Sequence, residues 1–335
     1  MDGVRTHAGA IAAIVVLVLS FAIPFLTEDP FVYSVANQVA IAIPASFSVY
    51  LMLRMDLLTF AVPAFMAAGG YAVAIAGLKG VTDSFALTAL SFLVPALIAL
   101  PLGALVLRLK GVYFVLVTFV LTEITELILF ETPGLTGGSN GLVGMPPTTL
   151  FGIELPDNRS VLLLAVAVAV AAAVVTALVT GYHRQSFAAI EENETLAESL
   201  GLVVWRRKVV GFVVAAGLGG MAGFSLVNML LTAHPSSFSS SSSVTYIAYA
   251  IVGGRRSMLG PIAGSVLLVF MSNLFSNQGQ YAPALFGLLI IAVVLVARGG
   301  IVGTLAGLAA PFRRSPPGGV RIAAAAAPAA AGGQP

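Results

Sequence analysis

Cysteine is absent from this chain of 335 residues, and charged side chains are few. Without cysteine the chain can form neither a disulfide nor a thiolate metal site. Only three histidines occur, His7, His183 and His234, and they lie far apart, so we expect no metal site built from them. Charged residues make up 9% of the chain, whereas a soluble globular protein carries about a quarter. The composition therefore excludes an ordinary soluble domain.

Signals for nucleotide binding and for enzyme chemistry are also missing. No glycine-rich loop followed by Gly-Lys-Ser or Gly-Lys-Thr occurs, so any ATP that drives this protein must be hydrolysed by another chain. Acids, bases and metal ligands do not cluster, and we expect no catalytic site and no cofactor. The net charge of +2 and the sequence pI near 9.0 do not indicate a nucleic-acid partner.

Hydrophobic residues are abundant: they make up 59% of the chain, and the mean hydropathy is +1.02. Apolar runs close to the roughly 20 residues needed to cross a bilayer recur along the sequence. These runs are continuous and do not alternate, which favours helices over a β-barrel. We predict an all-α integral membrane protein, a polytopic bundle of about ten spans, near residues 8–26, 33–53, 57–78, 84–107, 112–130, 160–181, 209–231, 239–253, 258–275 and 281–297.

Two of these runs could cross the membrane only halfway, so eight or nine full spans remain possible. The run at 57–78 contains Pro63, and the run at 239–253 is short and begins in serines. The first run is expected to be a retained span, because no small-residue cleavage site follows it. We predict a transmembrane permease domain at residues 1–310 and a disordered cytoplasmic tail, rich in proline, alanine and glycine, at residues 311–335.

Lysine and arginine residues fall almost entirely on one side of this layout. If both termini are cytoplasmic, only Lys79 and Arg159 of the 16 basic residues lie outside. Short loops rich in lysine and arginine face the cytoplasm, so this pattern predicts cytoplasmic termini. The residues assigned to the cytoplasmic side are Arg5, Arg54, Arg108, Lys110, Arg184, Arg206, Arg207, Lys208, Arg255, Arg256, Arg298, Arg313, Arg314 and Arg321.

The loop at residues 182–208 interrupts the apolar pattern, because four glutamates and four basic residues lie between His183 and Lys208. Between Phe187 and Leu200 the residues favour one helix, which Gly201 is positioned to end. On a helical projection one arc carries Phe187, Ile190, Leu196, Ala197 and Leu200, and the opposite arc carries Glu191, Glu192, Thr195 and Glu198. We interpret the segment as an amphipathic cytoplasmic helix. Its acidic face should be repelled by anionic lipid and indicates a protein partner; the alternative is a solvated connector.

Two carboxylates interrupt the run at residues 112–130. Glu123 and Glu126 share a helix face with Thr122, and Thr118 lies about one turn away. A carboxylate at mid-bilayer costs roughly 2.5–3.5 kcal/mol on insertion scales, so both should face protein or water. Three roles stay open for them: the lining of a translocation path, a hydrogen bond that fixes helix packing, and a proton relay.

Uncharged polar and small residues give further expectations. Asn37 and Gln38 are added to the candidate path, although such amides more often bond neighbouring helices, as we expect for Asn228. In the outer loop, residues 137–141 predict either a nest of backbone N–H groups for an anion or a tight turn. The small residues at 217–223 predict close approach between helix backbones.

At several of these positions the chain resembles the permease subunit of branched-chain amino acid ABC importers, the Liv-type family. That family carries a segment close to IRENE-x-AA-x-x-x-G, matched here from Ile190 to Gly201. The loop from Leu135 to Leu142 resembles its LTGGSNGL. Val252-Gly253-Gly254 followed by Leu259-Gly260-Pro261 and Gly264 resembles its GGxGSxxGPxxGA. The resemblance covers roughly residues 33–305.

The resemblance implies a multi-pass protein of the bacterial inner membrane that works with a second permease subunit, cytoplasmic ATP-binding subunits and an extracytoplasmic solute-binding protein. The residues that it assigns to ATPase coupling are Ile190, Glu191, Glu192, Asn193, Glu194, Ala197 and Gly201. It implies transport of a small polar solute, a branched-chain amino acid or a related amino acid or amide; relatives also carry urea or aromatic acids. The alternative is a secondary transporter or channel that couples protons or cations through Glu123 and Glu126.

The chain departs from the family pattern at several places. Glu191 stands where the family usually has arginine. Ala61-Val62 replaces a Gly-His pair, and Arg255-Arg256 replaces small residues. The first departure changes the charge of the coupling segment, and the second bears on the identity of the solute.

Overall fold

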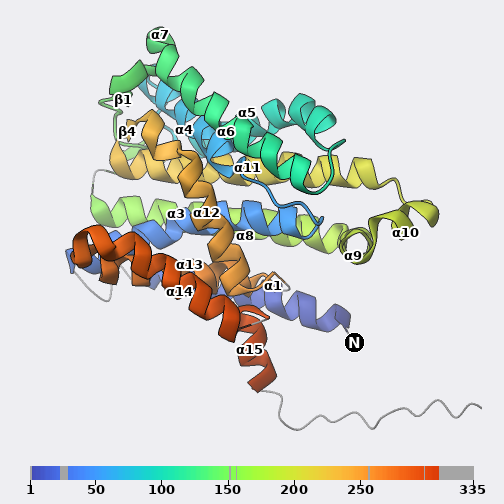
Figure 1. Cartoon of the computed structure of the whole chain (residues 1–335). Helices are drawn as coiled ribbons and strands as arrows, with labels where there is room; N and C mark the ends of the chain where they lie inside the picture. Colours follow the sequence, from blue (N-terminus) through green and yellow to red (C-terminus); the bar gives the residue numbers. More distant parts are fainter. Residues whose placement is uncertain are drawn as a thin grey trace, which may run out of the picture.

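The computed structural model describes residues 2–22, 29–150, 152–155, 157–255, 257–297 and 299–308. Within these residues the chain is a bundle of helices with four strands of two residues each (Figure 1). The predicted all-α fold is therefore confirmed. The expected tail at 311–335, together with Arg256 and Arg298, lies outside the described residues.

The longer helices follow the apolar runs, and short ones join them. The helices are α1 (Asp2–Leu19), α3 (Pro30–Leu53), α4 (Val62–Leu78), α5 (Ser84–Val106), α6 (Val112–Glu131), α7 (Pro133–Thr136), α8 (Asn158–Tyr182), α9 (Arg184–Glu192), α10 (Glu194–Ser199), α11 (Val204–Leu230), α12 (Ser240–Gly253), α13 (Leu259–Phe275), α14 (Ala282–Val296) and α15 (Gly300–Leu308). Single 3-10 turns lie at Ser20–Ala22, Gly138–Asn140, Pro235–Phe238 and Ser276–Tyr281.

The four strands form two small antiparallel pairs. β1 (Leu142–Val143) pairs with β4 (Thr232–Ala233), so that Leu142 lies opposite Ala233. β2 (Thr149–Leu150) pairs with β3 (Ile153–Glu154). Both pairs belong to the loops that connect long helices.

Each predicted span contains a helix, but the count of ten spans is not confirmed. Six helical segments of the described chain are long and apolar enough to cross a membrane, namely Pro30–Leu53, Ser84–Val106, Val112–Glu131, Asn158–Tyr182, Val204–Leu230 and Ala282–Thr304. Three shorter apolar helices lie at Gly9–Ala22, Val62–Leu78 and Leu259–Phe275. α12 has 14 residues, fewer than the roughly 20 that span a bilayer.

Helix α11 lies at the centre of the core and packs on α3, α4 and α5. Its small residues permit this: a Cβ at Gly220 would overlap the carbonyl oxygen of Ser91 on α5. A Cβ at Gly223 would overlap the carbonyl oxygen of Met66 on α4. The predicted close approach at 217–223 is thus confirmed, and it places two helices in backbone contact with α11.

A second glycine contact joins α12 to α13. A Cβ at Gly253 would overlap the carbonyl oxygen of Gly260, and one at Gly264 would overlap that of Tyr249. These are the glycines of the GGxGSxxGPxxGA-like segment. The motif therefore corresponds to a helical hairpin with backbones in contact.

The two ends of the bundle carry different elements. In Figure 1, α9, α10 and the start of α1 lie at one end, on the right of the view, whereas α7, β1 and β4 lie at the opposite end. We call these the α9–α10 end and the α7 end. Arg54, after α3, forms an ion pair with α9, and Lys110, before α6, forms one with α10. Basic residues from separate loops thus gather at the α9–α10 end.

Candidate functional site

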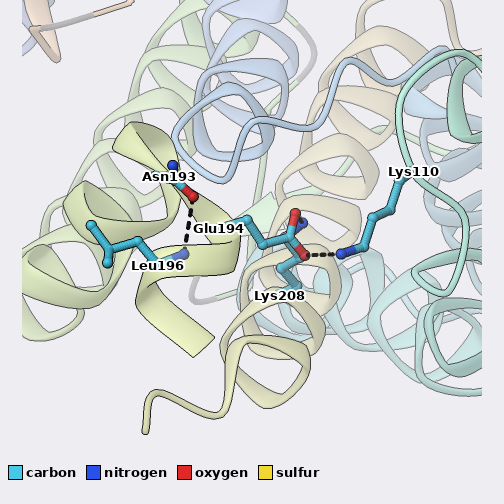
Figure 2. A network of polar contacts seen from close by, with 5 residues as sticks. All are labelled: Lys110, Asn193, Glu194, Leu196 and Lys208. Carbon is cyan, nitrogen blue, oxygen red and sulfur yellow. Dashed lines mark hydrogen bonds and ion pairs between the residues drawn. The ribbon is translucent and has the colours of Figure 1, made fainter. Parts of the chain in front are cut away.

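The charged loop contains two helices where the sequence predicted one. α9 ends at Glu192, Asn193 takes an extended conformation (φ −161°, ψ 108°), and α10 begins at Glu194. The Asn193 side chain accepts a hydrogen bond of 3.0 Å from the Leu196 N–H and so caps α10 (Figure 2). The continuous helix from Phe187 to Leu200 is therefore wrong. Asparagine is among the best N-cap residues, and this preference was the signal that marked the break.

The break changes which apolar side chains are buried. Ile190, Ala197 and Val204 form a small core that joins α9, α10 and the start of α11. Leu196 and Leu200 were placed on the same arc, but their exposed fractions are 56% and 80%. The extended residue at 193 shifts the phase between the two helices, and a projection of one continuous helix cannot represent this.

Two of the glutamates face other parts of the same chain. Glu191 Oε2 lies 2.7 Å from Arg54 Nη1, at the end of α3. Glu194 lies between two lysines, with its Oε1 3.2 Å from Lys110 Nζ and its Oε2 2.9 Å from Lys208 Nζ (Figure 2). The coupling segment is thereby attached to α3, to the loop before α6, and to α11.

The surroundings of Glu194 favour its ionised form. Burial alone would raise the pKa of the Glu194 carboxyl, but the hydrogen bonds and charges of Lys208 and Lys110 outweigh burial and leave the pKa below its ordinary value. The Lys208 side chain is only 6% exposed, so Glu194 supplies the counter-charge for a buried ammonium group. Lys110 is 64% exposed and contributes less.

An exposed apolar surface lies beside this network. It consists of Leu196, Leu200 and Val203, and we call it the α10 patch. Glu192 and Glu198 are exposed on the same two helices. Gly201 has φ +87° and follows the last turn of α10, where its N–H reaches the Glu198 carbonyl at 2.9 Å. Its predicted role as a helix stop is confirmed.

A second group of polar contacts surrounds the non-helical residues before α4. The Phe60 N–H donates to Thr118 Oγ1 at 3.1 Å. The Phe60 carbonyl accepts from Thr122 Oγ1 at 2.8 Å and from Ser243 Oγ at 2.6 Å. Unpaired backbone groups are costly at membrane depth. Hydroxyls of α6 and α12 form hydrogen bonds with the N–H and carbonyl of Phe60, which lies outside any helix. The sequence pattern assigned Thr118 to a path and placed Thr122 near it on the same helix, but it did not predict the contact with Ser243.

Glu123 lies on the opposite side of α6 from the buried Phe114, whereas Glu126 lies on the same side as the buried Leu129. Glu123 is exposed, and it accepts a hydrogen bond from the Ser240 hydroxyl in the first turn of α12. Glu126 is partly buried. A carboxylate at a helix N-terminus is electrostatically favourable, so Glu123 also stabilises the start of α12.

Asn37 and Gln38 lie in another part of the bundle. Gln38 exchanges hydrogen bonds with Asn273 of α13, with Asn273 Nδ2 donating to Gln38 Oε1 at 3.0 Å. Asn37 is 5% exposed, and its Oδ1 has no hydrogen-bond partner in the described protein atoms. The five residues predicted for the path therefore divide between α6 and α3.

The glycine-rich outer loop forms a tight turn. The N–H groups of Gly137 and Gly141 donate to the Pro133 and Gly138 carbonyls at 3.1 Å each, and Gly138 N–H donates to Thr136 Oγ1 at 3.2 Å. These amides are used within the turn, which supports the turn interpretation over an anion nest. His234 Nε2 lies 3.0 Å from the Ser139 carbonyl and ties the turn to the loop before α12.

Among the described residues, no group of three or more histidine, aspartate or glutamate side chains is arranged to hold a metal ion.

Comparison with known proteins gives three findings. A family model described as "Branched-chain amino acid transport system / permease component" matches residues 31–298. The chain is 27% identical over 304 residues to the "High-affinity branched-chain amino acid transport system permease protein LivM" of Salmonella typhimurium, a match that covers 83% of this chain and 71% of the relative. It is 28% identical over 218 residues to the protein of the same description from Escherichia coli, covering 58% of this chain and 51% of the relative.

A more limited similarity joins the chain to a sugar permease. The "Xylose/arabinose import permease protein XylH" of Sulfolobus acidocaldarius is 28% identical over 117 residues, which is 32% of this chain and 33% of the relative. No solved structure matches this chain at a significant level.

Proposed function

This chain belongs to the family of permease components of branched-chain amino acid transport systems, and from that premise we propose that it is one of two permease subunits of an ABC importer. It is a multi-pass membrane transport protein and not an enzyme. In this proposal cytoplasmic ATP-binding subunits drive the cycle, an extracytoplasmic solute-binding protein delivers the solute, and both termini and the α9–α10 end face the cytoplasm.

The observation that carries the ATPase assignment is the α10 patch. Leu200 is 80% exposed at the tip of a charged segment outside the apolar helices, and Leu196 lies beside it at 56%. An exposed apolar patch with a polar rim is typical of a protein interaction site. The two free glutamates, Glu192 and Glu198, oppose binding to anionic lipid and fit a protein partner.

The ion pairs give this surface a route into the bundle. Glu191 connects it to the end of α3 through Arg54, and Glu194 connects it to the loop before α6 through Lys110 and to α11 through Lys208. A partner that moves α10 would therefore move charges paired with three other segments of the chain. In this proposal Glu191, unusual for the family, transmits motion to Arg54 and does not contact the ATPase.

A Leu200→Glu variant tests the docking assignment. In the complete importer reconstituted in vesicles, we expect ATPase co-purification and ATP-driven uptake to fall about tenfold or more, because a charge enters an apolar contact. Leu135→Glu is the matched control: Leu135 is 62% exposed, but it lies at the α7 end. Full uptake by Leu200→Glu, with the ATPase still bound, would contradict the assignment.

For the translocation path, we propose the side of α6 that carries Glu123. Exposed side chains on this helix include Leu116, Val120 and Leu127, with the Glu123 carboxylate among them. A carboxylate is rarely tolerated in contact with lipid tails, so this side needs a protein or aqueous neighbour. In this proposal the second permease subunit is the protein neighbour, and the path between the two subunits is the aqueous one. Glu123 and Glu126 then border that path.

The absence of cysteine makes this assignment simple to test. Single cysteines at Val120 and Leu127 should cross-link to cysteines introduced into the second permease subunit. A single cysteine at Leu288 on α14, where the side chain is 63% exposed, serves as control and should not cross-link. Cross-linking from α14 alone would assign the interface to the opposite region.

The transported solute follows from the family and not from this site. The relatives are described as branched-chain amino acid permeases, and we propose a branched-chain amino acid or a related amino acid or amide. Secondary transport through Glu123 and Glu126 is not favoured. Uptake that stops on ATP depletion would support the ABC importer. Uptake that depends on the proton gradient alone would contradict it.

A further inference from the structure

A cavity of about 660 Å³ lies where α8 passes into α9 and meets the first turns of α11. Its lining includes Tyr182, His183, Arg184, Gln185, Ser186 and Arg207. This volume lies within the range of roughly 300–1,000 Å³ that small-molecule sites occupy. The cavity is distinct from the α10 patch, whose residues do not line it.

The cavity is positively charged. Arg184 and Arg207 both line it, and none of its lining residues is acidic. The ion pairs found in the described part of the chain use Arg54, Lys110 and Lys208, and neither cavity arginine takes part in them. Two guanidinium groups thus face a space that holds no carboxylate, and guanidinium groups bind phosphate well.

His183 adds a neutral hydrogen-bonding group. Burial and the neighbouring Arg207 charge lower the pKa of the His183 imidazole. Arg207 Nη1 lies 3.0 Å from His183 Nδ1. Because a guanidinium only donates, Nδ1 must accept, and the ring hydrogen is then on Nε2. His183 therefore orients Arg207 and, because the imidazole is uncharged, leaves the positive charge of Arg207 available to an anion.

The backbone contributes further donors. α9 begins at Arg184 without a side-chain cap. The first backbone bond of this turn runs from the Phe187 N–H to the His183 carbonyl at 2.9 Å, so the N–H groups of residues 184–186 precede it. Amides at a helix start and the positive end of the helix dipole both favour an anion.

The position of the cavity identifies the source of that anion. α8 is a candidate membrane span that ends at Tyr182, and α11 is another that starts at Val204. Tyr182 is 85% exposed and Trp205 is 47% exposed, one at each of these helix ends. Exposed tyrosine and tryptophan at the ends of spans lie at the level of the lipid headgroups. The basic cavity therefore opens at the membrane boundary.

We propose that this cavity binds the phosphate of an anionic phospholipid headgroup from the leaflet at the α9–α10 end, with Arg184 and Arg207 as the charged contacts. Free phosphate or a soluble phosphate ester shares the chemistry, but the aromatic residues and helix ends favour the lipid. Basic cavities between spans on the cytoplasmic side commonly bind such headgroups. Bound lipid would anchor α9 beside the coupling segment.

Lipid retention by the full-length chain tests the proposal. The purified protein is exchanged into mixtures of phosphatidylglycerol and phosphatidylcholine, and bound lipid is counted by native mass spectrometry. We expect the unmodified protein to retain phosphatidylglycerol at least fivefold over phosphatidylcholine, and Arg184→Gln and Arg207→Gln to lose most of this preference. Equal retention of the two lipids by the unmodified protein would overturn the proposal without any variant.

Arg206→Gln is the matched control. Arg206 is exposed and adjacent to Arg207, but it does not line the cavity. Arg206→Gln removes one positive charge, as Arg207→Gln does, but outside the cavity. Its preference for phosphatidylglycerol should therefore stay within about twofold of the unmodified protein. A loss equal to that of Arg207→Gln would show general surface attraction and overturn the site.

Inorganic phosphate and glycerol 3-phosphate separate the possible sources. Neither should displace the lipid at millimolar concentration; displacement by either one would assign the cavity to a soluble anion. The readout is lipid retention and does not involve ATP or solute, so its failure is distinguishable from failure of the proposed transport function.

Discussion

At the α9–α10 end, Glu191 and Glu194 reach arginine and lysine side chains of three other segments. At the α7 end, the pairing of β1 with β4 and the contact of His234 with Ser139 join the glycine turn to the loop before α12. Attraction between charges falls slowly with distance, whereas hydrogen bonds are short and directional. We therefore expect the ion pairs of the α9–α10 end to tolerate a displacement better than the hydrogen-bonded turn of the α7 end.

The largest effect should come from a glycine at the α7 end. Gly141 has φ +65° and ψ −174°, a conformation that only glycine adopts readily, and a Cβ there would overlap the Ala233 carbonyl. We expect Gly141→Ala to lower the free energy of unfolding by about 2–4 kcal/mol.

Gly201 is the matched position at the other end. Its φ is +87°, but a Cβ there would meet nothing within 4 Å. Gly201→Ala should cost only about 1–2 kcal/mol. Unfolding in mixed detergent micelles, followed by circular dichroism, measures both variants. Equal losses would remove the contrast between the ends.

The next effect concerns the two lysines that share Glu194. Glu194→Gln leaves the Lys208 ammonium, 6% exposed, without its counter-charge, and we expect a loss of about 1–3 kcal/mol. Lys110→Gln should cost less than about 1 kcal/mol, because Lys110 is 64% exposed. The same micelle titration measures both. A larger loss from Lys110→Gln would mean that burial does not set the strength of these pairs.

A charge exchange between Glu191 and Arg54 tests whether the α9–α10 end transmits motion of a partner to the bundle. Glu191→Arg places a second cation beside Arg54 and should cost about 1–2 kcal/mol. In vesicles the solute imported per ATP should also fall. The double variant Arg54→Glu with Glu191→Arg restores opposite charges and should recover both values. Unchanged transport per ATP in the single variant would rule out this pair as a transmission route.

The smallest effect is a pH dependence of the Glu194 contribution. The pKa of Glu194 is lowered in the folded chain, so its stabilising effect is complete above the unfolded value of about 4.3 and is lost as the pH falls through the folded pKa. The difference in unfolding free energy between the unmodified chain and Glu194→Gln should be constant near neutral pH and shrink in acid. A difference that grows as the pH falls would contradict a lowered pKa of Glu194 in the folded chain.

Parts of the site could be read from local sequence, and others could not. Gly201 was correctly placed as a helix stop, because a glycine after a helical run is a local signal. The exposure of Leu200 was not predicted, because it depends on the break at Asn193. The partners of Glu191 were also missed, since Arg54 is 137 residues away in sequence and only packing brings the two together.

Local sequence was enough to predict where this chain is apolar, where most of its helices lie and which loops carry its basic residues. Those properties depend on composition over about 20 residues and on loop charge, and both are local. The packing of the helices sets which glutamates are paired and which leucines are exposed, and it brings hydroxyls of α6 and α12 to the backbone of Phe60. These depend on helix crossings that bring distant residues within 3–4 Å, and no pattern of neighbouring residues encodes such distances.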